Sequence, residues 1–150
     1  MGKYLVGTGG TFDHLHEGHL KLLEVAFNVG KKVMIGLTTD ELLHQKKFKE
    51  FIESYEIRES GLRKYASSIG REGDLVIIPL HDPFGPAITE PGIDIHISSE
   101  ETFDVARKIN DIRREKNLKP MMLLMIPMEM SDDGSRYSST KIREKMKNNM

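Results

Sequence analysis

The sequence contains no cysteine, which excludes disulfide bonds and thiolate metal sites and suits a reducing compartment, so we expect a cytoplasmic protein. No apolar segment approaches the roughly 18 residues of a membrane span, and the apolar run near the N-terminus is too short for a signal peptide. Positive charge is not in excess either, because 22 Lys+Arg face 23 Asp+Glu. We therefore expect neither a membrane nor a nucleic acid as partner, and any anionic ligand has to be held by a local site.

The 150 residues fit one domain, spanning residues 1–150, with a single core. Short apolar runs alternate with longer segments at helical spacing, which predicts a parallel sheet covered by helices on both faces and therefore the α/β class. The predicted strands are Lys3–Val6, Lys32–Leu37, Asp74–Leu80, Asp94–Ile97 and Met121–Ile126. The predicted helices are Gly18–Asn28, Thr39–Gln45, Tyr55–Ile69, Glu100–Glu115 and Ser139–Lys147. Gly30 and Gly70 stand where helices are expected to end.

The segment His81–Gly92 follows the third predicted strand and contains Pro83, Pro86 and Pro91. Proline removes a backbone donor and restricts the residue before it, so this segment is predicted to be a loop without regular structure. Open α/β sheets bind ligands at the carboxyl ends of their strands. The loop is thus expected to border a ligand site.

The densest signal is GTGGTFDHLHEGHL, which lies between the first predicted strand and the first predicted helix. Glycines allow a tight turn and close approach of a ligand to the backbone, and a helix start offers unpaired N–H groups that suit phosphate. A dinucleotide fingerprint beginning at Gly7 and Gly9 would require glycine or alanine where Phe12 stands. A GxxxxGK[ST] phosphate loop is absent as well. The pattern predicts an anion site of another kind.

Two histidines, His16 and His19, stand three residues apart, so both side chains can face one side as the helix begins. Attack on the α-phosphate of a nucleoside triphosphate increases negative charge on the phosphate oxygens, and fixed donors lower that barrier. One such donor is typically worth about 3–4 kcal/mol. A small rise in pKa beside phosphate would make each imidazole a cation at neutral pH.

A zinc site is the competing interpretation, because His14-Leu15-His16-Glu17-Gly18-His19 superficially resembles an HxHxDH metal motif. Gly18 stands where that motif needs aspartate, and no other histidine-rich segment offers further ligands. We interpret His14 as a spacer within the turn.

The sequence GTFDHLHEGH resembles the GTFDxxHxGH signature of the HIGH-type nucleotidyltransferases, and Tyr137-Ser138-Ser139-Thr140-Lys141 resembles their ISSTK-like second signature. The resemblance implies that the two motif histidines contact the nucleotide phosphates and the transition state. It also implies that Thr11 and Phe12 lie along the triphosphate and the acceptor. The stretch Gly134–Thr140 differs from the RTxGISTT-like pattern of cytidylyltransferases, which disfavours CTP as the donor.

GLTTDELLHQKK, IIPLHDPFGPAITEPGID and ISSEETFDVARKINDIR resemble the archaeal and eukaryotic family of phosphopantetheine adenylyltransferases over almost the full length. That resemblance implies transfer of AMP from ATP to 4′-phosphopantetheine, with Mg²⁺, giving dephospho-coenzyme A and pyrophosphate. It further implies one doubly wound Rossmann-like domain with a five-stranded parallel sheet in the order 3-2-1-4-5.

The same resemblance assigns roles to individual residues. The catalytic residues it implies are His19, His16 and Lys46. The ATP-binding residues it implies are Thr11, Phe12, Gly18, Asn110, Arg113, Ser138, Ser139 and Thr140. The acceptor-binding residues it implies are Thr11, Asp13 and Lys46, and no protein side chain is assigned to the metal.

Several alternatives stay open at this stage. Lys47 stands beside Lys46 and the LLKxK pattern reads LLHQK here, so the phosphate-binding lysine is fixed only to within one position. Asn110 and Arg113 lie three residues apart on a charged helix, where a structural ion pair explains their presence at least as well as contact with the nucleotide does. Asp40 is interpreted as the cap of the short second helix. Nicotinamide mononucleotide or flavin mononucleotide as acceptor, and a nucleotide-binding regulator without turnover, are the remaining functional hypotheses.

Overall fold

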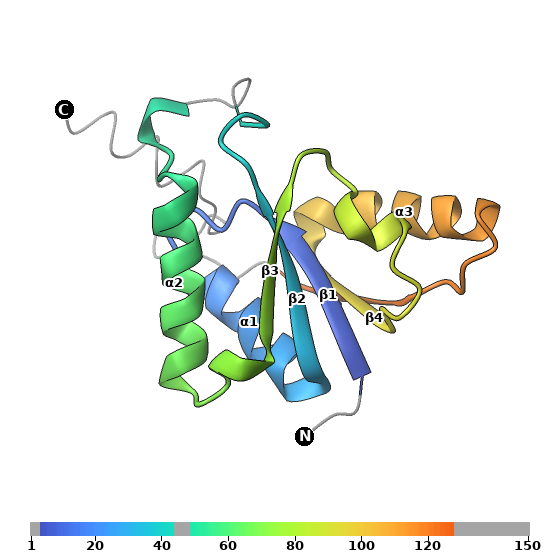
Figure 1. Ribbon diagram of the computed structural model, residues 1–150, viewed down its shortest axis with the longest axis horizontal. Helices are drawn as coiled ribbons and strands as arrows, with labels where there is room; N and C mark the ends of the chain where they lie inside the picture. Colours follow the sequence, from blue (N-terminus) through green and yellow to red (C-terminus); the bar gives the residue numbers. More distant parts are fainter. Residues whose placement is uncertain (1–3, 44–48, 128–150) are drawn as a thin grey trace.

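The computed structural model describes residues 4–43 and 49–127, which form a parallel five-stranded sheet in the order β3-β2-β1-β4-β5 (Figure 1). The strands are β1 Tyr4–Gly10, β2 Gly30–Thr38, β3 Leu75–Leu80, β4 Ile95–Ser99 and β5 Met122–Ile126. The helices are α1 Glu17–Val29, α2 Tyr55–Ser68 and α3 Phe103–Glu115, with the short 3₁₀ turns η1 Lys49–Phe51, η2 Glu72–Asp74, η3 Gly85–Ile88 and η4 Glu100–Thr102. The predicted class and strand order are confirmed.

The helices lie on both faces of the sheet, with α1 and α2 on one face and α3 on the other (Figure 1). The core of the α1 and α2 side contains inward residues of all five strands, among them Val6, Ile35 and Ile97. The α3 side is built around Ile93 and Ile109. Because the strand order reverses between β1 and β4, a crevice for a ligand is expected at the carboxyl ends of these two strands.

The two glycines at helix ends serve different purposes. Gly70 adopts a φ of 71° just after α2, the left-handed conformation that glycine enters without a steric penalty. Gly30 instead has an extended backbone and begins β2 directly after α1. A Cβ atom at Gly30 would lie 2.8 Å from Cγ2 of Val6 and 2.9 Å from the carbonyl oxygen of Lys32, so the tight connection requires glycine for lack of space.

The predicted helix Thr39–Gln45 is wrong where the structure describes it, because residues 40–43 form a turn closed by the Leu43 N–H and the Asp40 carbonyl at 3.1 Å. Asp40 does not cap a helix there; its carboxylate forms an ion pair with Arg58. The loop His81–Gly92 is not wholly irregular, since it includes η3. The predicted helix Ser139–Lys147 lies outside the described residues.

In the described part of the chain, no helix combines the length and the apolar character that crossing a membrane requires.

Candidate active site

The turn between β1 and α1, together with the start of α1, carries half of the predicted site residues and lies at the carboxyl edge of the sheet (Figure 1). Phe12 and His14 adopt φ angles of 50° and 47°, a left-handed conformation that is uncommon for residues with a side chain. The Phe12 ring is buried, and its centroid lies 5.5 Å from that of His19. The turn thereby brings Phe12, His16 and His19 together.

His16 is the N-cap of α1 and forms an unusual capping box with His19. Nδ1 of His16 accepts a hydrogen bond from the Gly18 N–H at 3.0 Å, and the His16 N–H donates to Nδ1 of His19 at 3.3 Å. The two rings stack with their centroids 4.0 Å apart. A histidine pair therefore satisfies helix N-terminal donors that Ser, Thr, Asp or Asn usually satisfy.

These contacts assign the tautomer of both imidazoles. A ring nitrogen that accepts from a backbone N–H is unprotonated, so the proton of each neutral ring resides on Nε2. In His16 and His19 the Nε2 atom therefore carries the hydrogen, and both residues stand at the positive end of α1. This arrangement suits an anion with several oxygens.

Burial lowers the pKa of both histidines. Desolvation is the main cause of the decrease at His19, where the neighbouring His16 contributes further, and the pKa falls to about 3. Desolvation also lowers the pKa of His16. Both imidazoles are thus neutral at physiological pH in this structure, whereas the cationic form beside a bound phosphate stays a prediction.

Two other residues assigned from the motif are engaged within the protein. The side chain of Asp13 has none of its surface exposed, and its Oδ1 accepts the N–H of Glu53 at 2.8 Å. The structure therefore does not present this carboxylate to an acceptor. The backbone N–H of Gly18 donates to the His16 ring, so this donor is already used at the start of α1.

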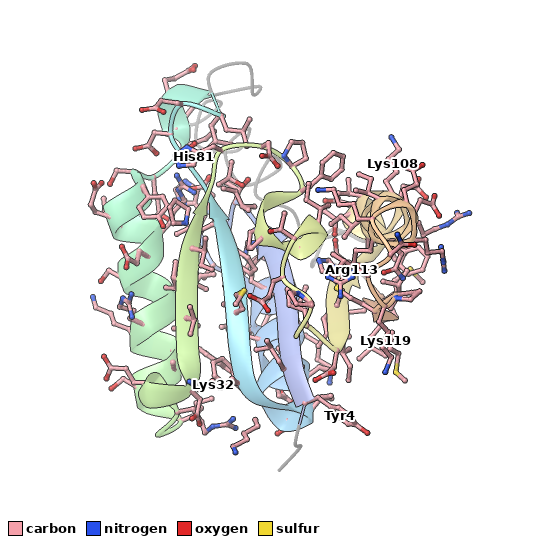
Figure 2. All side chains as sticks on the ribbon, turned by 45° about the vertical axis from the view of Figure 1, so that its right-hand side comes forward. Tyr4, Lys32, His81, Lys108, Arg113 and Lys119 are labelled. Atoms are coloured by element: carbon pink, nitrogen blue, oxygen red, sulfur yellow. The ribbon has the colours of Figure 1, made fainter. Side chains whose placement is uncertain are left out.

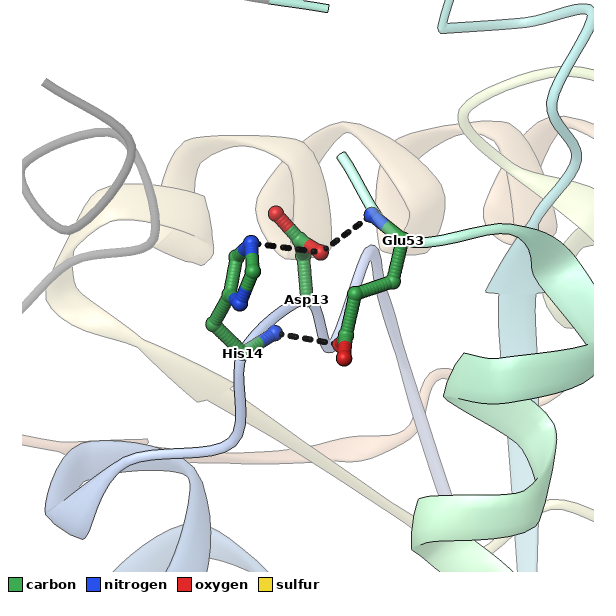
Figure 3. Close-up of side chains that lie close together, drawn as sticks. All are labelled: Asp13, His14 and Glu53. Carbon is green, nitrogen blue, oxygen red and sulfur yellow. Dashed lines mark hydrogen bonds and ion pairs between the residues drawn. The ribbon is translucent and has the colours of Figure 1, made fainter. Parts of the chain in front are cut away.

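Asp13, His14 and Glu53 form a cluster whose ligand-type atoms lie within 4.8 Å of one another (Figure 3). Every one of these atoms already has a hydrogen-bond role: Nε2 of His14 contacts the Phe51 carbonyl at 2.8 Å, and Oε1 of Glu53 accepts the His14 N–H at 2.8 Å. The carboxylate of Asp13 holds the Glu53 backbone in return. The cluster connects two chain segments and is not arranged as a metal centre.

Arg58, which no sequence motif indicated, lies in the first turn of α2 and is 1% exposed. Its guanidinium donates to the carbonyls of Glu53, Thr11 and Thr38 and to the carboxylate of Asp40, at distances of 2.9, 3.1, 2.7 and 2.8 Å. The sequence signal for the burial of Arg58 is helical spacing, because Arg58 shares a face of α2 with the buried Leu62 and Ala66. That spacing points the side chain toward the sheet.

Asn110 and Arg113 lie on the opposite face of the sheet from the histidines. The Asn110 amide donates to the carbonyl of Met121 and accepts its N–H, both at 2.8 Å. Arg113 is fully buried between α3 and the η3 segment (Figure 2) and donates to three backbone carbonyls. These carbonyls belong to Ala87, Glu90 and Lys119. Both side chains thus organise loops, and neither forms the ion pair considered from the sequence.

A small pocket of about 30 Å³ lies on the same face, under the loop after β3. Glycines 7, 9 and 36 contribute to its lining, and the side chains of Ile93 and Leu80 pack directly over them. Its other walls are mainly apolar and include Phe84 and Ile109, with His96 as a polar member. The Nδ1 atom of His96 is buried without a hydrogen-bond partner among the described residues, and desolvation lowers the pKa of this histidine to about 4.

The remaining predicted site residues lie outside the described ranges. They are Lys46 with its alternative Lys47, and the second signature with Ser138, Ser139 and Thr140.

A parallel sheet with a histidine pair at the first strand–helix turn defines a nucleotidyltransferase of the cytidylyltransferase-like class. Residues 8–145 match the cytidylyltransferase-like family, and the chain belongs to this family.

The chain is also similar to individual proteins. The chain is 44% identical over 140 residues to phosphopantetheine adenylyltransferase of Methanosarcina mazei, covering 91% of this chain and 88% of that protein. It is 41% identical over 139 residues to phosphopantetheine adenylyltransferase of Methanothermobacter thermautotrophicus, covering 93% and 82%. A solved structure of an Archaeoglobus fulgidus protein of unknown function superposes with a TM-score of 0.74 at 25% identity, covering 89% of this chain and 98% of that chain.

Proposed function

We propose that this protein transfers AMP from ATP to 4′-phosphopantetheine, giving dephospho-coenzyme A and pyrophosphate. The observation that carries the proposal is the pair of Nε2–H donors of His16 and His19 at the start of α1. The relatives named above, at 41% and 44% identity over most of both chains, support the choice of donor and acceptor.

The reaction is an in-line displacement at the α-phosphorus of ATP. An oxygen of the acceptor phosphate forms the new bond to this phosphorus, while the bond to the oxygen bridging toward the β-phosphate breaks and pyrophosphate leaves. No general base is required, because the attacking phosphate is already anionic near neutral pH. The protein has to place the two reactants and stabilise the extra charge.

His16 and His19 supply that stabilisation. Their Nε2–H groups donate to the phosphate oxygens on which negative charge accumulates, and the start of α1 adds the positive end of its dipole. The neutral rings are held rigidly by stacking and by backbone contacts, so little reorganisation is needed when the transition state forms. Protonation is not required for this role.

The pocket beside His96 is the proposed site for the uncharged arm of the acceptor. Its glycine-lined strands and apolar walls suit an extended chain with few polar groups, and His96 borders it with a buried ring nitrogen that has no partner among the described residues. Its volume of about 30 Å³ requires the loop after β3 to shift when the arm enters. A narrow pocket of this kind favours a flexible chain over the broad rings of nicotinamide or flavin mononucleotide.

Mg²⁺ is proposed to enter with ATP and to offset the charge of its phosphates. The one Asp/His/Glu group found among residues 4–43 and 49–127 uses its ligand atoms in hydrogen bonds, so it does not fit the ion. The metal is thus expected to rely on phosphate oxygens and water for its ligands.

The test is pyrophosphate release from ATP with 4′-phosphopantetheine, nicotinamide mononucleotide or flavin mononucleotide as acceptor. We expect release only with 4′-phosphopantetheine, and the same assay with His19→Ala controls for a contaminating enzyme. Release with another acceptor would mean that the protein performs the same chemistry on a different acceptor substrate. Binding of ATP without release in any reaction would contradict the proposal and favour a regulator.

A further inference from the structure

Arg58 connects three segments of the chain that approach the site from different directions. Its guanidinium donates to Thr11 in the turn after β1, to Thr38 at the end of β2, and to Glu53 immediately before α2. The side chain is buried, and the Asp40 carboxylate pairs with its remaining terminal nitrogen at 2.8 Å. A planar guanidinium with five donors can hold several carbonyls in a fixed relation, which a lysine cannot do.

Glu53 adds a second, reciprocal connection to the same turn (Figure 3). Its backbone N–H donates to the Asp13 carboxylate, and its own carboxylate accepts the backbone N–H of His14, each at 2.8 Å. The His14 ring contacts the carbonyl of Phe51 in the same segment. Four contacts, counting the one between Arg58 and Thr11, therefore join residues 11–14 to the beginning of α2.

The turn needs such external support because of its backbone conformation. Phe12 and His14 both have positive φ angles, and side-chain-bearing residues keep this conformation only where the surroundings impose it. Arg58 donates to the carbonyl of residue 11 and Glu53 accepts the N–H of residue 14, and Phe12 lies between these two contacts. Phe12 in turn contacts the His19 ring, which stacks on His16. A shift of the turn would therefore displace both imidazoles.

We propose that Arg58 and Glu53 are positioning residues for phosphate transfer, acting through the backbone of the turn at residues 11–14 on the Nε2–H donors of His16 and His19. Neither residue has to touch the substrate. The inference rests on the proposed function for its kinetic consequences, but the placement of the imidazoles is measurable without turnover.

The kinetic test compares Glu53→Ala, Glu53→Gln and the control Glu56→Ala. Glu56 is an exposed carboxylate three residues further along, in the first turn of α2. Displacement of reacting groups by about 1 Å can cost about 100-fold in rate, so Glu53→Ala is expected to lower kcat on this order while the KM for ATP changes little. Glu53→Gln keeps an oxygen that can accept the His14 N–H, so most of kcat should return. Glu56→Ala should match the wild-type protein.

The second measurement is the ¹⁵N NMR spectrum of the histidine rings, recorded without substrates. In the wild-type protein both rings are expected to show a protonated Nε2 and an unprotonated Nδ1. Glu53→Ala and Arg58→Lys should change the tautomer populations or broaden the signals of His16 and His19, while Glu56→Ala leaves them unchanged.

Unaltered ring signals together with wild-type kcat in Glu53→Ala, measured well below its melting temperature, would overturn the inference. A lowered Tm with unchanged kcat and ring signals would equally do so, because it would show a purely structural role. If the wild-type protein fails to use 4′-phosphopantetheine, the proposed function falls, whereas the NMR comparison still decides the positioning role.

Discussion

The rings of His16 and His19 stack at a centroid distance of 4.0 Å, and the backbone N–H of the first donates to Nδ1 of the second. His16 therefore orients His19 through both its ring and its main chain. The same contacts cap α1, so the helix start and the donor pair are a single structure. Loss of either imidazole is expected to affect chemistry and local stability together, and suitable substitutions separate the two effects.

Replacing His19 with alanine removes one Nε2–H donor and the stacking partner of His16. Loss of a donor of this kind typically lowers kcat by about 10²–10³-fold, and we expect a decrease in this range. Steady-state pyrophosphate release measures it. Glu24→Ala, on the exposed side of the same helix, is the matched control and should retain wild-type turnover. Retention of more than about a tenth of kcat by His19→Ala would contradict the catalytic role.

At His16, asparagine and alanine distinguish capping from catalysis. Asparagine is a good N-cap whose side-chain oxygen can replace Nδ1 as acceptor for the Gly18 N–H, but it has no group at the position of Nε2. We expect His16→Asn to keep near wild-type stability and lose kcat, whereas His16→Ala loses kcat and also about 1 kcal/mol of unfolding free energy. Denaturant unfolding and turnover are measured on both. Equal stability losses in the two variants would refute the capping role.

The acceptor pocket is tested by adding a single methyl group at Gly9. A Cβ there would lie 3.4 Å from Cδ1 of Leu80 and 3.5 Å from the carbonyl oxygen of Gly36, which are ordinary contacts, so Gly9→Ala should fold. One methyl group in a binding pocket changes discrimination by about 10–200-fold, and we expect the KM for 4′-phosphopantetheine to rise toward this range. The KM for ATP should stay constant. Gly73→Ala, with no atom within 4 Å of its Cβ, should change neither constant.

Much of the fold followed from sequence because parallel strands covered on both faces are short, continuous apolar runs, as in residues 33–37 of β2. The histidine pair followed from its spacing after a glycine turn. The helix expected at Thr39–Gln45 did not form in its described part, because Asp40 pairs with Arg58 from a helix further along the chain. Local propensity carries no information about such a tertiary partner.

The function of buried polar side chains was the least predictable part. Arg58 and Arg113 donate mainly to backbone carbonyls, and a carbonyl is present at every residue, so its partner leaves no mark in the sequence. The tautomers of His16 and His19 could not be predicted from sequence for the same reason, since contacts with backbone N–H groups determine them. Only the three-dimensional arrangement distinguishes these side chains from surface charges.

Asn110 provides a direct test of structural against nucleotide-binding roles. Its amide pairs with both backbone groups of Met121, and Asn110→Ala would leave a buried donor and acceptor unsatisfied. The typical cost is about 1–3 kcal/mol of unfolding free energy for each such group. We expect the variant to lose stability in this range or beyond while the KM for ATP is unchanged at temperatures where it is folded. A large increase in that KM would instead support the nucleotide role implied by the family resemblance.

The stability of the fold should fall in mild acid because His96 and His19 are buried in the neutral form. Burial lowers the pKa of His96 to about 4 and that of His19 to about 3, both below the ordinary value of 6.5. Between pH 6.5 and the lowered pKa, the unfolded chain binds a proton that the folded protein excludes. The free energy of unfolding that comes from the neutral imidazole is therefore fully present above pH 6.5 and decreases as the pH falls toward 4. Each imidazole contributes a slope of about 1.4 kcal/mol per pH unit in this window.

Urea unfolding at several pH values measures this slope, and His96→Leu removes the contribution of one histidine with a lowered pKa. The leucine keeps an apolar side chain in the pocket and carries no titratable group, so the decrease in unfolding free energy between pH 6.5 and pH 4 should be shallower by about 1.4 kcal/mol per pH unit. Carboxylates contribute equally to both proteins and cancel in the difference. His81→Gln replaces an exposed histidine outside the pocket and is the matched control. An unchanged slope in His96→Leu would mean that His96 does not resist protonation in the folded state.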